Sequence, residues 1–420
     1  MLIKKGVYFI SGPLNIKFIS GEVESIGRKF IPNEEVFVPE GKRIPLEVNS
    51  QEAVIETDDT GKITELPSRT IPDDWDRVVE YIISKRINSV IIFGEVDTGK
   101  TFFSTYLTNK LLSFNVKPSV LDCDTGQSDI GPPSTLGIAV FDKPILFMTE
   151  IEPTKLYFVG SHSPAEHFLH YLCGFTKLLN FGLKNSNVVI IDTPGWVLGD
   201  GGRMLRNSEI EILSALGTNY LVILLERNKE IEHLVRSIPQ ERIMRLTVSK
   251  KASPTSTDER KKLREFVYKK YFSELEDVEF SFQEIFTDRS YFLTGEKIEN
   301  KTKIKSIKWL ERLPGFEGLY VVSSKQITDG EKQILQKVYN VKKIRNPVVE
   351  DFKNVIVALL DGNHEFICLA IIKDIDFVNS KIYLTYPKRY DVRDVKIIQF
   401  GSLKLTPEAK ENGFVEPGIL

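Results

Sequence analysis

The chain opens with short runs in which apolar and polar residues alternate. Between Val7 and Thr57, the runs VYFI, NIKFI, EVFV, IPLEV and AVIET are separated by SGP, SGE, PNE, PEG and NSQ. Alternation with a period of two is typical of half-buried strands, and the intervening residues are those that turns favour. The pattern predicts a small all-β domain over residues 1–70. Its last part, Asp58 to Thr70, is polar and shows no sustained periodicity.

Residues 71–275 alternate apolar runs with longer amphipathic segments. The region begins with IPDDWDRVVEYIISK, where Pro72 and the following Asp pair are typical of a helix start. Further along, the runs SVIIF, SVLDCD, KLYFVG, NVVIID, YLVILLE and RIMRLTVS are interleaved with TFFSTYLTNKLLSF and AEHFLHYLCGFTKLL. Near-continuous apolar strands separated by helices predict an α/β core with a doubly wound, mostly parallel sheet.

Residues 276–420 return to β-type composition after the helical segment DERKKLREFVYKKYF. The runs are SYFLTG, GLYVVSS, NVIVALLD, FICLAIIKDI, KIYLTY and VKIIQFG, with one helix expected around Asp329 to Tyr339. We therefore expect a C-terminal, mostly β domain, which makes the chain a central α/β domain between two β-rich ones.

The composition narrows the class of protein. The 420 residues are 41% apolar and 27% charged, as in globular proteins with a large core, and the net charge of -2 excludes a globally basic coat for duplex nucleic acid. Cys123, Cys173 and Cys368 are too scattered for a disulfide framework or a four-thiolate zinc site. Since no apolar run approaches about 18 residues, we expect a cytoplasmic protein without a membrane span.

The strongest chemical motif is a glycine-rich loop between a strand and a helix. The sequence Gly94-Glu95-Val96-Asp97-Thr98-Gly99-Lys100-Thr101 fits G-x-x-x-x-G-K-[ST] and lies between SVIIF and a predicted helix. In this P-loop context, backbone N–H groups and the helix N-terminus bind phosphates, and Lys100 reaches the β- and γ-phosphates. The Thr101 hydroxyl is suited to ligate Mg²⁺. The motif predicts a nucleoside triphosphate site.

Carboxylates follow two of the predicted core strands. Asp192 ends NVVIID, where a P-loop protein commonly places an Mg²⁺ ligand, and Asp122 and Asp124 end SVLDCD. Period-two alternation directs Asp122 and Asp124 to the same side, so we expect both to converge near the phosphate loop. Either Asp122 or Asp124 is then a candidate general base, and the other can bind metal-bound water. Asp124 is also a candidate metal ligand.

A GTPase is the main alternative at this point, because Asp192-Thr193-Pro194-Gly195 also matches a GTPase switch motif. Guanine-reading proteins need an Asn-Lys-x-Asp after a later strand. The nearest candidate is Asn228-Lys229-Glu230-Ile231, which has Ile231 in place of the required Asp. This substitution counts against guanine specificity.

Taken together, the motifs resemble those of the polynucleotide 5′-hydroxyl kinases of RNA processing, the group of the pre-mRNA cleavage-complex kinase and the nucleolar pre-ribosomal RNA kinase. The resemblance is carried by GEVDTGKT, DCDTGQSDIGPPSTLG, VGSHSP and DTPGW. It extends to SGEVESIG near the N-terminus and to LAIIKDIDFVNSKIYLTYP and FGSLKL near the C-terminus. It therefore spans nearly the whole chain.

The resemblance implies roles for several residues. Gln127 matches a glutamine that contacts substrate or the metal shell, and Trp196 resembles a clasp tryptophan on which the terminal base stacks. Glu24 matches a glutamate that approaches the adenine base. The family commonly has Asn where this chain has Asp192, which leaves the division of labour among Asp122, Asp124 and Asp192 open.

A basic segment follows the last predicted core strand. It carries eight Lys or Arg, Lys250 and Lys251 among them, against three acidic residues over Lys250 to Lys270. Arg260 and Arg264 are four residues apart, hence on one helix face, with the R-x-x-x-R spacing of the family's lid. We interpret the segment as a lid whose two guanidiniums close over the γ-phosphate and exclude water, with an ordinary solvated helix face as the alternative.

Four further residues are candidates for contact with the acceptor strand. Arg203 and Arg206 follow the glycine-rich turn after Trp196, and His162 and Ser163 belong to VGSHSP. The spacing of His162, His167 and His170 invites a zinc interpretation. No nearby Cys or carboxylate completes a ligand set, so we interpret these histidines as structural.

The predicted function is an ATP- and Mg²⁺-dependent kinase that transfers the γ-phosphate to the 5′-hydroxyl of single-stranded or end-exposed RNA, with DNA as an open alternative acceptor. Two other functions compete with it. One is a P-loop GTPase or ATPase switch, and the other is a non-catalytic ATP-binding scaffold in RNA processing. Protein partners do not follow from the sequence.

Overall fold

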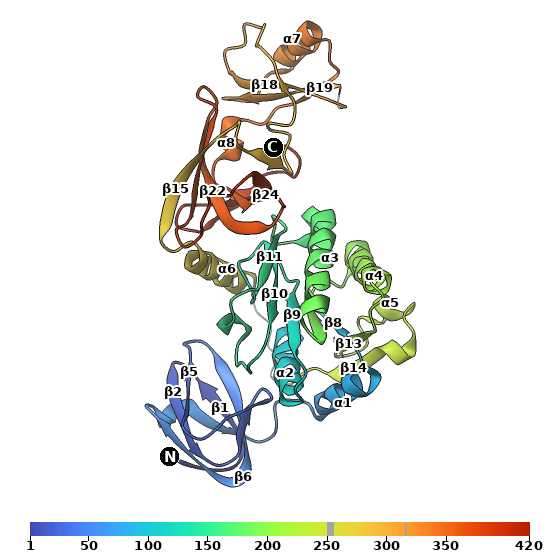
Figure 1. The fold of residues 1–420 in the computed structure, drawn as a ribbon, viewed down its shortest axis with the longest axis vertical. Coiled ribbons are helices and arrows are strands. Elements are labelled where there is room, and N and C mark those ends of the chain that lie inside the picture. Colours follow the sequence, from blue (N-terminus) through green and yellow to red (C-terminus); the bar gives the residue numbers. More distant parts are fainter. Residues whose placement is uncertain (250–255, 316) are drawn as a thin grey trace.

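The computed structural model describes residues 1–249, 256–315 and 317–420, and the predicted lid residues Lys250 and Lys251 lie outside them. The chain forms an elongated molecule in which an N-terminal sheet, a central α/β unit and a C-terminal β-rich unit follow one another (Figure 1). The predicted mixed α/β class with several sheets is confirmed. No helix in the described part of the chain is long and apolar enough to cross a membrane.

The N-terminal sheet has seven strands, and β6 is its longest. The sequence predicted two strands separated by a turn at Asn49-Ser50-Gln51, but β6 runs unbroken and pairs with β1, β2 and β3. The polar stretch after it also contributes a short strand, β7, which pairs with β1. The strands are β1 (Leu2–Ser11), β2 (Leu14–Ser20), β3 (Val23–Ser25), β4 (Arg28–Lys29), β5 (Glu34–Val38), β6 (Arg43–Thr57) and β7 (Ile63–Leu66).

The central sheet has the order β11-β10-β9-β12-β8-β13-β14, and its five strands from β9 to β14 are parallel. β10 runs antiparallel to both of its neighbours, β9 and β11. This strand was not predicted: only its first three residues belong to the motif DCDTGQSDIGPPSTLG. The strands are β8 (Ser89–Phe93), β9 (Pro118–Asp122), β10 (Thr135–Val140), β11 (Lys155–Phe158), β12 (Val188–Asp192), β13 (Tyr220–Glu226) and β14 (Ile243–Thr247).

Helices cover both faces of this sheet, and the side chains of β8 show why. Val90 and Ile92 pack with α1 and α2, whereas Ile91 and Phe93 pack with α3 and α4. A strand buried on both faces needs no polar positions, which explains its continuous apolar sequence. The helices are α1 (Asp76–Lys85), α2 (Lys100–Ser113), α3 (Phe168–Asn185), α4 (Gly199–Ala215) and the short α5 (Glu232–Val235).

The C-terminal part begins after helix α6 (Thr257–Tyr271) and contains two sheets. The predicted helix α7 (Asp329–Tyr339) is confirmed, with a capping box between Thr328 and Glu331. The predicted strand SYFLTG is wrong, because these residues form turns that bury Phe292. The larger sheet contains β15 (Leu275–Ser281), β16 (Phe286–Asp288), β21 (Val355–Leu360), β22 (Phe366–Asp376), β23 (Lys381–Pro387), β24 (Ile397–Leu405) and β25 (Glu411–Phe414). The smaller sheet contains β17 (Glu296–Lys297), β18 (Ile307–Leu313), β19 (Gly318–Ser323) and β20 (Lys343–Arg345). Helix α8 (Val349–Phe352) leads from the smaller sheet back to the larger one.

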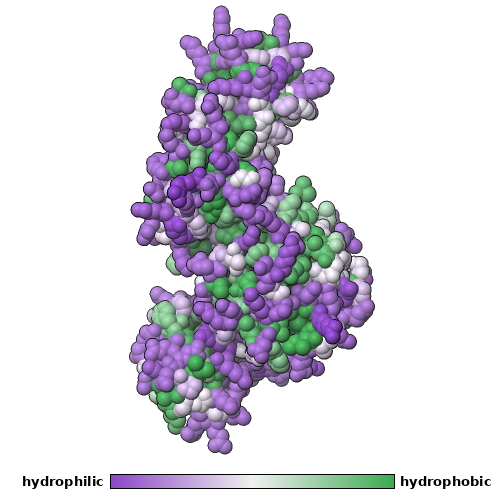
Figure 2. Space-filling model, in the orientation of Figure 1, coloured by the Kyte–Doolittle hydropathy of each residue, from purple (hydrophilic) through white to green (hydrophobic). Residues whose placement is uncertain are grey.

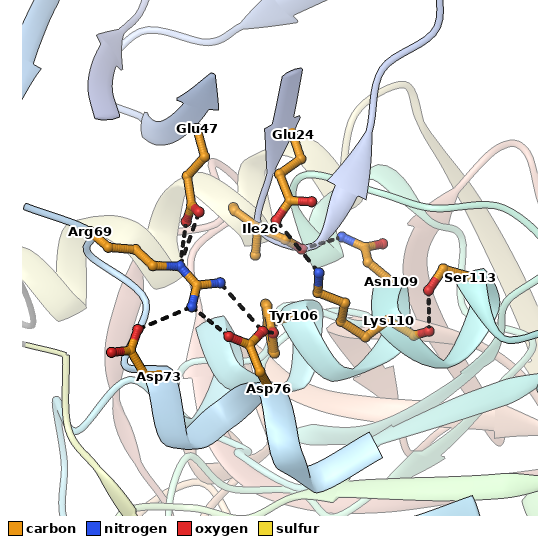
Figure 3. Close-up of polar contacts among 10 residues, drawn as sticks. All are labelled: Glu24, Ile26, Glu47, Arg69, Asp73, Asp76, Tyr106, Asn109, Lys110 and Ser113. Carbon is orange, nitrogen blue, oxygen red and sulfur yellow. Dashed lines mark hydrogen bonds and ion pairs between the residues drawn. The ribbon is translucent and has the colours of Figure 1, made fainter. Parts of the chain in front are cut away.

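The N-terminal sheet is joined to the central unit by a charged network around Arg69 (Figure 3). Its guanidinium donates to Glu47 of β6, with Nε 3.0 Å from Oε2, and also to Asp73 and Asp76 at the start of α1. Burial raises the pKa of Glu47, although the charge of Arg69 opposes the rise. Tyr106 of α2 donates to Asp76. One cation therefore holds carboxylates from both sides of the junction.

We expect Arg69→Ala to destabilise this junction by about 2–3 kcal/mol, somewhat below the loss of about 3–5 kcal/mol for a fully buried pair, because Arg69 is partly exposed. The first unfolding transition in urea measures the loss. As a control, Lys17→Ala removes an exposed pair with Glu35 and should cost less than about 1 kcal/mol. Equal effects of the two variants would contradict the role of Arg69.

Candidate active site

The phosphate loop turns tightly between β8 and α2. Asp97 and Gly99 adopt positive φ angles of 60° and 84°. A side chain on Gly94 would lie 2.5 Å from Oγ1 of Thr98 and 2.8 Å from the carbonyl oxygen of Leu225, so only glycine fits there. The loop ends where α2 begins, so the first N–H groups of that helix face the loop.

Lys100 is the buried cation of the loop. Its Nζ donates to the carbonyl oxygens of Gly94 at 3.1 Å and Glu95 at 2.9 Å. Burial lowers the pKa of this ammonium, and the carboxylates of Asp192 and Asp124 oppose that change. The predicted phosphate-binding lysine thus lies beside the predicted carboxylates.

Two of those carboxylates end neighbouring parallel strands. Asp122 of β9 and Asp192 of β12 are register partners, so their side chains start from adjacent positions at one edge of the sheet. Burial raises the pKa of Asp192 to about 7, although the ammonium of Lys100 and a hydrogen bond from Thr101 oppose the rise. Burial, with the charge of Asp192, also raises the pKa of Asp122.

The oxygen atoms near Thr101 suit a hard cation. Mg²⁺ is usually held by one or two carboxylates, hydroxyls, substrate phosphates and water. Thr101 and Asp192 are in hydrogen-bond contact, and Asp124 lies close enough to influence the charge of Asp192. Among the residues described, no group of three or more His, Cys, Asp or Glu forms a dedicated metal cage. This donor set therefore fits Mg²⁺ bound together with a nucleotide.

Asp122 and Asp124 both lie near the phosphate loop, as expected, but their carboxylates have different partners because β9 ends at Asp122. Oδ1 of Asp122 accepts from the N–H of Asp124, and Oδ2 accepts from Ser128, Asp129 and Ile130 at 2.7–3.1 Å. Asp122 thus shapes the loop that follows the strand.

Asp124 retains a free carboxylate oxygen. Its Oδ1 accepts from the N–H groups of Gly126 and Gln127, at 3.0 and 2.9 Å, whereas Oδ2 accepts no hydrogen bond from the described residues. The side chain is also partly exposed. Of the two carboxylates, Asp124 is the one that can meet a substrate.

Helix α6, the predicted lid, carries both arginines toward the phosphate loop and the C-terminal sheet. Nη2 of Arg260 lies 2.8 Å from Oδ2 of Asp97 in the loop. Nε of Arg264 lies 2.6 Å from Oε1 of Glu411 in β25. The amide of Gln127 donates weakly, at 3.4 Å, to the backbone carbonyl of Arg260. The two arginines therefore share a face of the helix but have different partners.

His162 contacts both helix α6 and Glu411 of the C-terminal sheet. Its Nε2 lies 3.0 Å from the hydroxyl of Tyr268 on α6, and its Nδ1 lies 3.7 Å from Glu411. Burial and then the charge of Arg264 lower the pKa of His162 to about 3, so the ring is neutral at physiological pH. Ser163 accepts from the N–H of Ala165 and so begins a short 3₁₀ helix. Neither His162 nor Ser163 is fully buried.

Trp196 lies in the turn between β12 and α4. A side chain on Gly201 would meet the indole ring at 2.3 Å, so the ring lies directly on this glycine. A side chain on Gly195 would lie 2.6 Å from the backbone nitrogen of Val96, so the turn also touches the phosphate loop. The Trp196 side chain is half-buried and packs against the apolar core of the central unit.

The prediction that Arg206 contacts the acceptor strand is wrong, because its side chain is fully buried. Nη1 of Arg206 lies 2.6 Å from Oε2 of Glu209, and Tyr171 donates to the other oxygen of Glu209. Burial raises the pKa of Glu209 to about 7, against the charge of Arg206. Arg203, three residues earlier on α4, is exposed.

Glu24 lies at the junction drawn in Figure 3 rather than at the phosphate loop. Its carboxylate lies 3.5 Å from Nζ of Lys110, near the end of α2, and is almost fully buried. Asn109, beside Lys110, donates to the backbone carbonyl of Ile26. Ten residues of helix, or about 15 Å along its axis, separate Lys110 from Lys100.

The guanine-reading and zinc interpretations find no support in the described part of the structure. Ile231, at the position where a guanine reader needs Asp, is fully buried, and Glu230 accepts from the N–H groups of Arg227 and Asn228. Nε2 of His167 lies 2.6 Å from Oγ of Ser402, which accords with a structural histidine.

Comparison with known proteins identifies the family. A profile described as "mRNA cleavage and polyadenylation factor CLP1 P-loop" matches residues 94–274. The polyribonucleotide 5′-hydroxyl-kinase of Pyrococcus abyssi is 32% identical over 355 residues, which cover 82% of this chain and 96% of that protein. The chain belongs to the polyribonucleotide 5′-hydroxyl-kinase family. The resemblance noted from the motifs is thereby confirmed.

Other members of the family extend the comparison. The polyribonucleotide 5′-hydroxyl-kinase of Pyrococcus furiosus is 29% identical over 82% of this chain and 96% of its own. The human polynucleotide 5′-hydroxyl-kinase NOL9 is 30% identical over 128 residues, which are 30% of this chain and 18% of NOL9. Clp1p in the wild-type Clp1p–Pcf11p complex has the same fold, with a TM-score of 0.64 and 15% identity over 96% of this chain and 97% of that one.

Three residues near the site were not predicted from the sequence. Glu411 and Tyr268 contact Arg264 and His162, yet neither belongs to a motif. Glu411 lies 147 residues from Arg264 along the chain, so only the folded structure brings them together. Asp129, whose N–H is bound by Asp122, was also overlooked although it lies within the quoted motif.

We expect Arg206→Met to lower the free energy of unfolding by about 3–5 kcal/mol, because it leaves the buried Glu209 without a cation. The matched variant Arg203→Met, on the exposed face of the same helix, should change it by less than about 0.5 kcal/mol. Urea titrations measure both.

The loss in Arg206→Met should be larger at pH 8 than at pH 6. Without the cation, the folded state holds Glu209 protonated to a higher pH than the unfolded state does. The folded state then binds more protons, and its stability falls as pH rises. A variant with unchanged stability but weakened RNA binding would restore the original interpretation of Arg206.

Proposed function

We propose that this chain is an ATP-dependent polynucleotide 5′-hydroxyl kinase that transfers the γ-phosphate of ATP to the 5′-hydroxyl of RNA. The observation that carries the proposal is the position of Lys100, in a phosphate loop beside Asp124 and Asp192, in a chain of this family. We infer that residues 71–275 form the catalytic unit, and that the three free cysteines reflect a cytoplasmic protein.

The phosphates of ATP are bound by the loop from Gly94 to Thr101. Backbone N–H groups and the start of α2 face the phosphates, and Lys100 exchanges its contacts with loop carbonyls for the β- and γ-phosphate oxygens. Thr101 and Asp192 would hold Mg²⁺, which would offset negative charge on the transferred group, and the one free oxygen of Asp124 is left for the acceptor. Glu24 is proposed to approach the adenine base from the N-terminal sheet.

Asp124 is the proposed general base. Because both oxygens of Asp122 already accept hydrogen bonds, Asp122 is left with the role of a positioning residue. The free oxygen of Asp124 takes the proton of the 5′-hydroxyl as that oxygen attacks the γ-phosphorus. The bond to the β-phosphate oxygen breaks, and ADP leaves with the electron pair.

The lid supplies positive charge to the transfer. Arg260 already contacts the phosphate loop through Asp97, and a small movement of α6 brings its guanidinium to the γ-phosphate. Arg264 must leave Glu411 to join it. Two guanidiniums over the γ-phosphate stabilise the transferred charge and exclude water, so that hydrolysis of ATP is disfavoured.

The acceptor end is proposed to lie between Trp196 and the loop of Gln127. The ring of Trp196 stacks on the terminal base, which tolerates any sequence. We assign the exposed Arg203 to backbone phosphates, and His162 and Ser163 to the acceptor groove. DNA ends would fit the same stacking contact and are the alternative acceptor.

Purified protein with labelled ATP and Mg²⁺ should transfer label to a 5′-hydroxyl RNA oligonucleotide, and Lys100→Ala should abolish the transfer. Asp124→Asn should lower kcat by about 10²–10⁴-fold, as expected for loss of a general base, with ATP binding retained. Asp122→Asn should act mainly on stability. Nucleotide hydrolysis without labelled ends would point to an ATPase switch and reject the kinase.

Trp196→Ala should raise KM for the oligonucleotide by about 5–150-fold, corresponding to the about 1–3 kcal/mol of one stacked base, and leave KM for ATP unchanged. Trp196→Phe keeps an aromatic face and should retain most of the affinity. Steady-state kinetics on RNA and DNA ends of equal length measure both effects. If Trp196→Ala changes stability but not KM, the indole is only a packing residue.

A further inference from the structure

The small sheet at the end of the molecule, with helix α7, forms a basic module over residues 296–346. It carries 12 Lys or Arg and 6 Asp or Glu, whereas the rest of the chain carries 44 and 52. The net charge of the whole chain is nearly zero, but residues 296–346 carry a clear excess of positive charge. It lies beyond the larger C-terminal sheet from the central unit (Figure 1), and its visible face is largely hydrophilic (Figure 2).

The module contains an open hollow of about 540 Å³, within the range of ligand sites, about 300–1,000 Å³. Its walls come from the segment before β18, the turn after β19 and the first turns of α7. The lining residues are Lys303, Ile304, Lys305, Ser306, Lys325, Glu331 and Ile334.

The three lysines of the hollow are exposed, and the charge of Lys325 acts on Glu331 without an ion pair between them. Lys303 and Lys305 alternate with the buried Ile304 and Ser306, so both ammonium groups stand on the solvent side of one extended segment. None of Lys303, Lys305 and Lys325 forms an ion pair within residues 1–249, 256–315 and 317–420. Three ammonium groups without an ion pair therefore surround one hollow, which favours an external anion there.

Ser306 supplies a second, independent observation. Its side chain is only 9% exposed, and its Oγ has no hydrogen-bond partner in the part of the chain that the structure describes. Buried hydroxyls without a partner are rare and call for an explanation. A hydroxyl beside three ammonium groups is suited to donate to an anionic oxygen that enters the hollow.

The acidic residue of the hollow does not neutralise it. Oε2 of Glu331 accepts from the N–H of Thr328 at 2.8 Å and from its hydroxyl at 3.0 Å, so this carboxylate is occupied as the cap of α7. Three lysines against one carboxylate leave the lining with a positive balance. The described lining has no aromatic ring, so it offers nothing on which a base could stack.

We propose that this hollow binds backbone phosphates of the RNA substrate, away from the 5′ end that reacts in the central unit. Lysines bind phosphate as point charges, without reading sequence, and the Ser306 hydroxyl adds a fixed donor. This inference rests on the proposed function, because it assigns the body of the same RNA strand to a second site. The hollow acts only on strands long enough to reach the module.

The test compares the full-length protein with the variant Lys303→Ala/Lys305→Ala/Lys325→Ala. Both are given a tetranucleotide and an RNA of about 30 nucleotides, which is longer than the about 4–16 nucleotides that a single-strand-binding fold typically covers. The variant should bind the long RNA about tenfold more weakly. The slope of log K against log salt should fall by about 2, from about 0.7 per lost phosphate contact. KM and kcat for the tetranucleotide should not change, which also shows that the variant is folded.

A control variant keeps the loss of charge but spares the hollow. Lys308→Ala/Lys337→Ala/Lys342→Ala removes three exposed lysines of the same module that do not line it, and should reduce binding of the long RNA less than threefold. Equal losses in both variants, or no loss in the first, would overturn the inference.

Binding is measured by fluorescence anisotropy, which needs no turnover. Failure of the kinase proposal, seen as absent transfer, is therefore distinct from failure of the hollow, seen as unchanged affinity and salt slope. Tighter binding of a polyglutamate peptide than of RNA, lost in the hollow variant, would assign the hollow to an acidic protein segment and reject RNA.

Discussion

The active site depends on a cluster of buried charges at one edge of the central sheet. Asp122 and Asp192 end adjacent strands, and Lys100 begins the helix that follows the next strand. Burying any one of these charges alone would cost much desolvation free energy. The attraction between Lys100 and the carboxylates offsets part of that cost. Burial raises the pKa of Asp192 to about 7, and the charge of Lys100 opposes this rise. The protonated and ionised forms of Asp192 are therefore close in free energy near neutral pH. A bound nucleotide and metal change that balance directly.

The same strand order explains why the loop after β9 is specific. Asp122 is fixed by its register with Asp192, and its oxygens then bind the backbone of residues 124–130. Asp124 is thereby positioned by its neighbour rather than by the strand. The free oxygen of Asp124 and the lid contact of Gln127 both follow from that arrangement. One buried aspartate thus organises the part of the site that meets the acceptor.

Local features were predictable from the sequence, whereas distant contacts were not. The phosphate loop, the helix over Asp329–Tyr339 and the strands around SVIIF depend on glycines, caps and apolar runs within a few residues. The pairing of Arg264 with Glu411 joins segments 147 residues apart, and no local pattern carries it. Arg206 was misjudged because a polar residue after a glycine-rich turn looks exposed, while α4 buries one face against α3. The strand β10 was missed because Gly137 interrupts its apolar positions and leaves only short apolar runs.

Helix α2 mechanically links the N-terminal sheet to the phosphate loop. At its start, Lys100 closes the loop, and at its other end Asn109 and Lys110 bind Ile26 and Glu24 of the N-terminal sheet. Tyr106, between them, donates to Asp76 in the network of Arg69 (Figure 3). Buried side chains of both units form one continuous hydrophobic cluster, so the junction is packed like a core. Helix α2 therefore connects the N-terminal sheet with the phosphate loop through contacts at both of its ends.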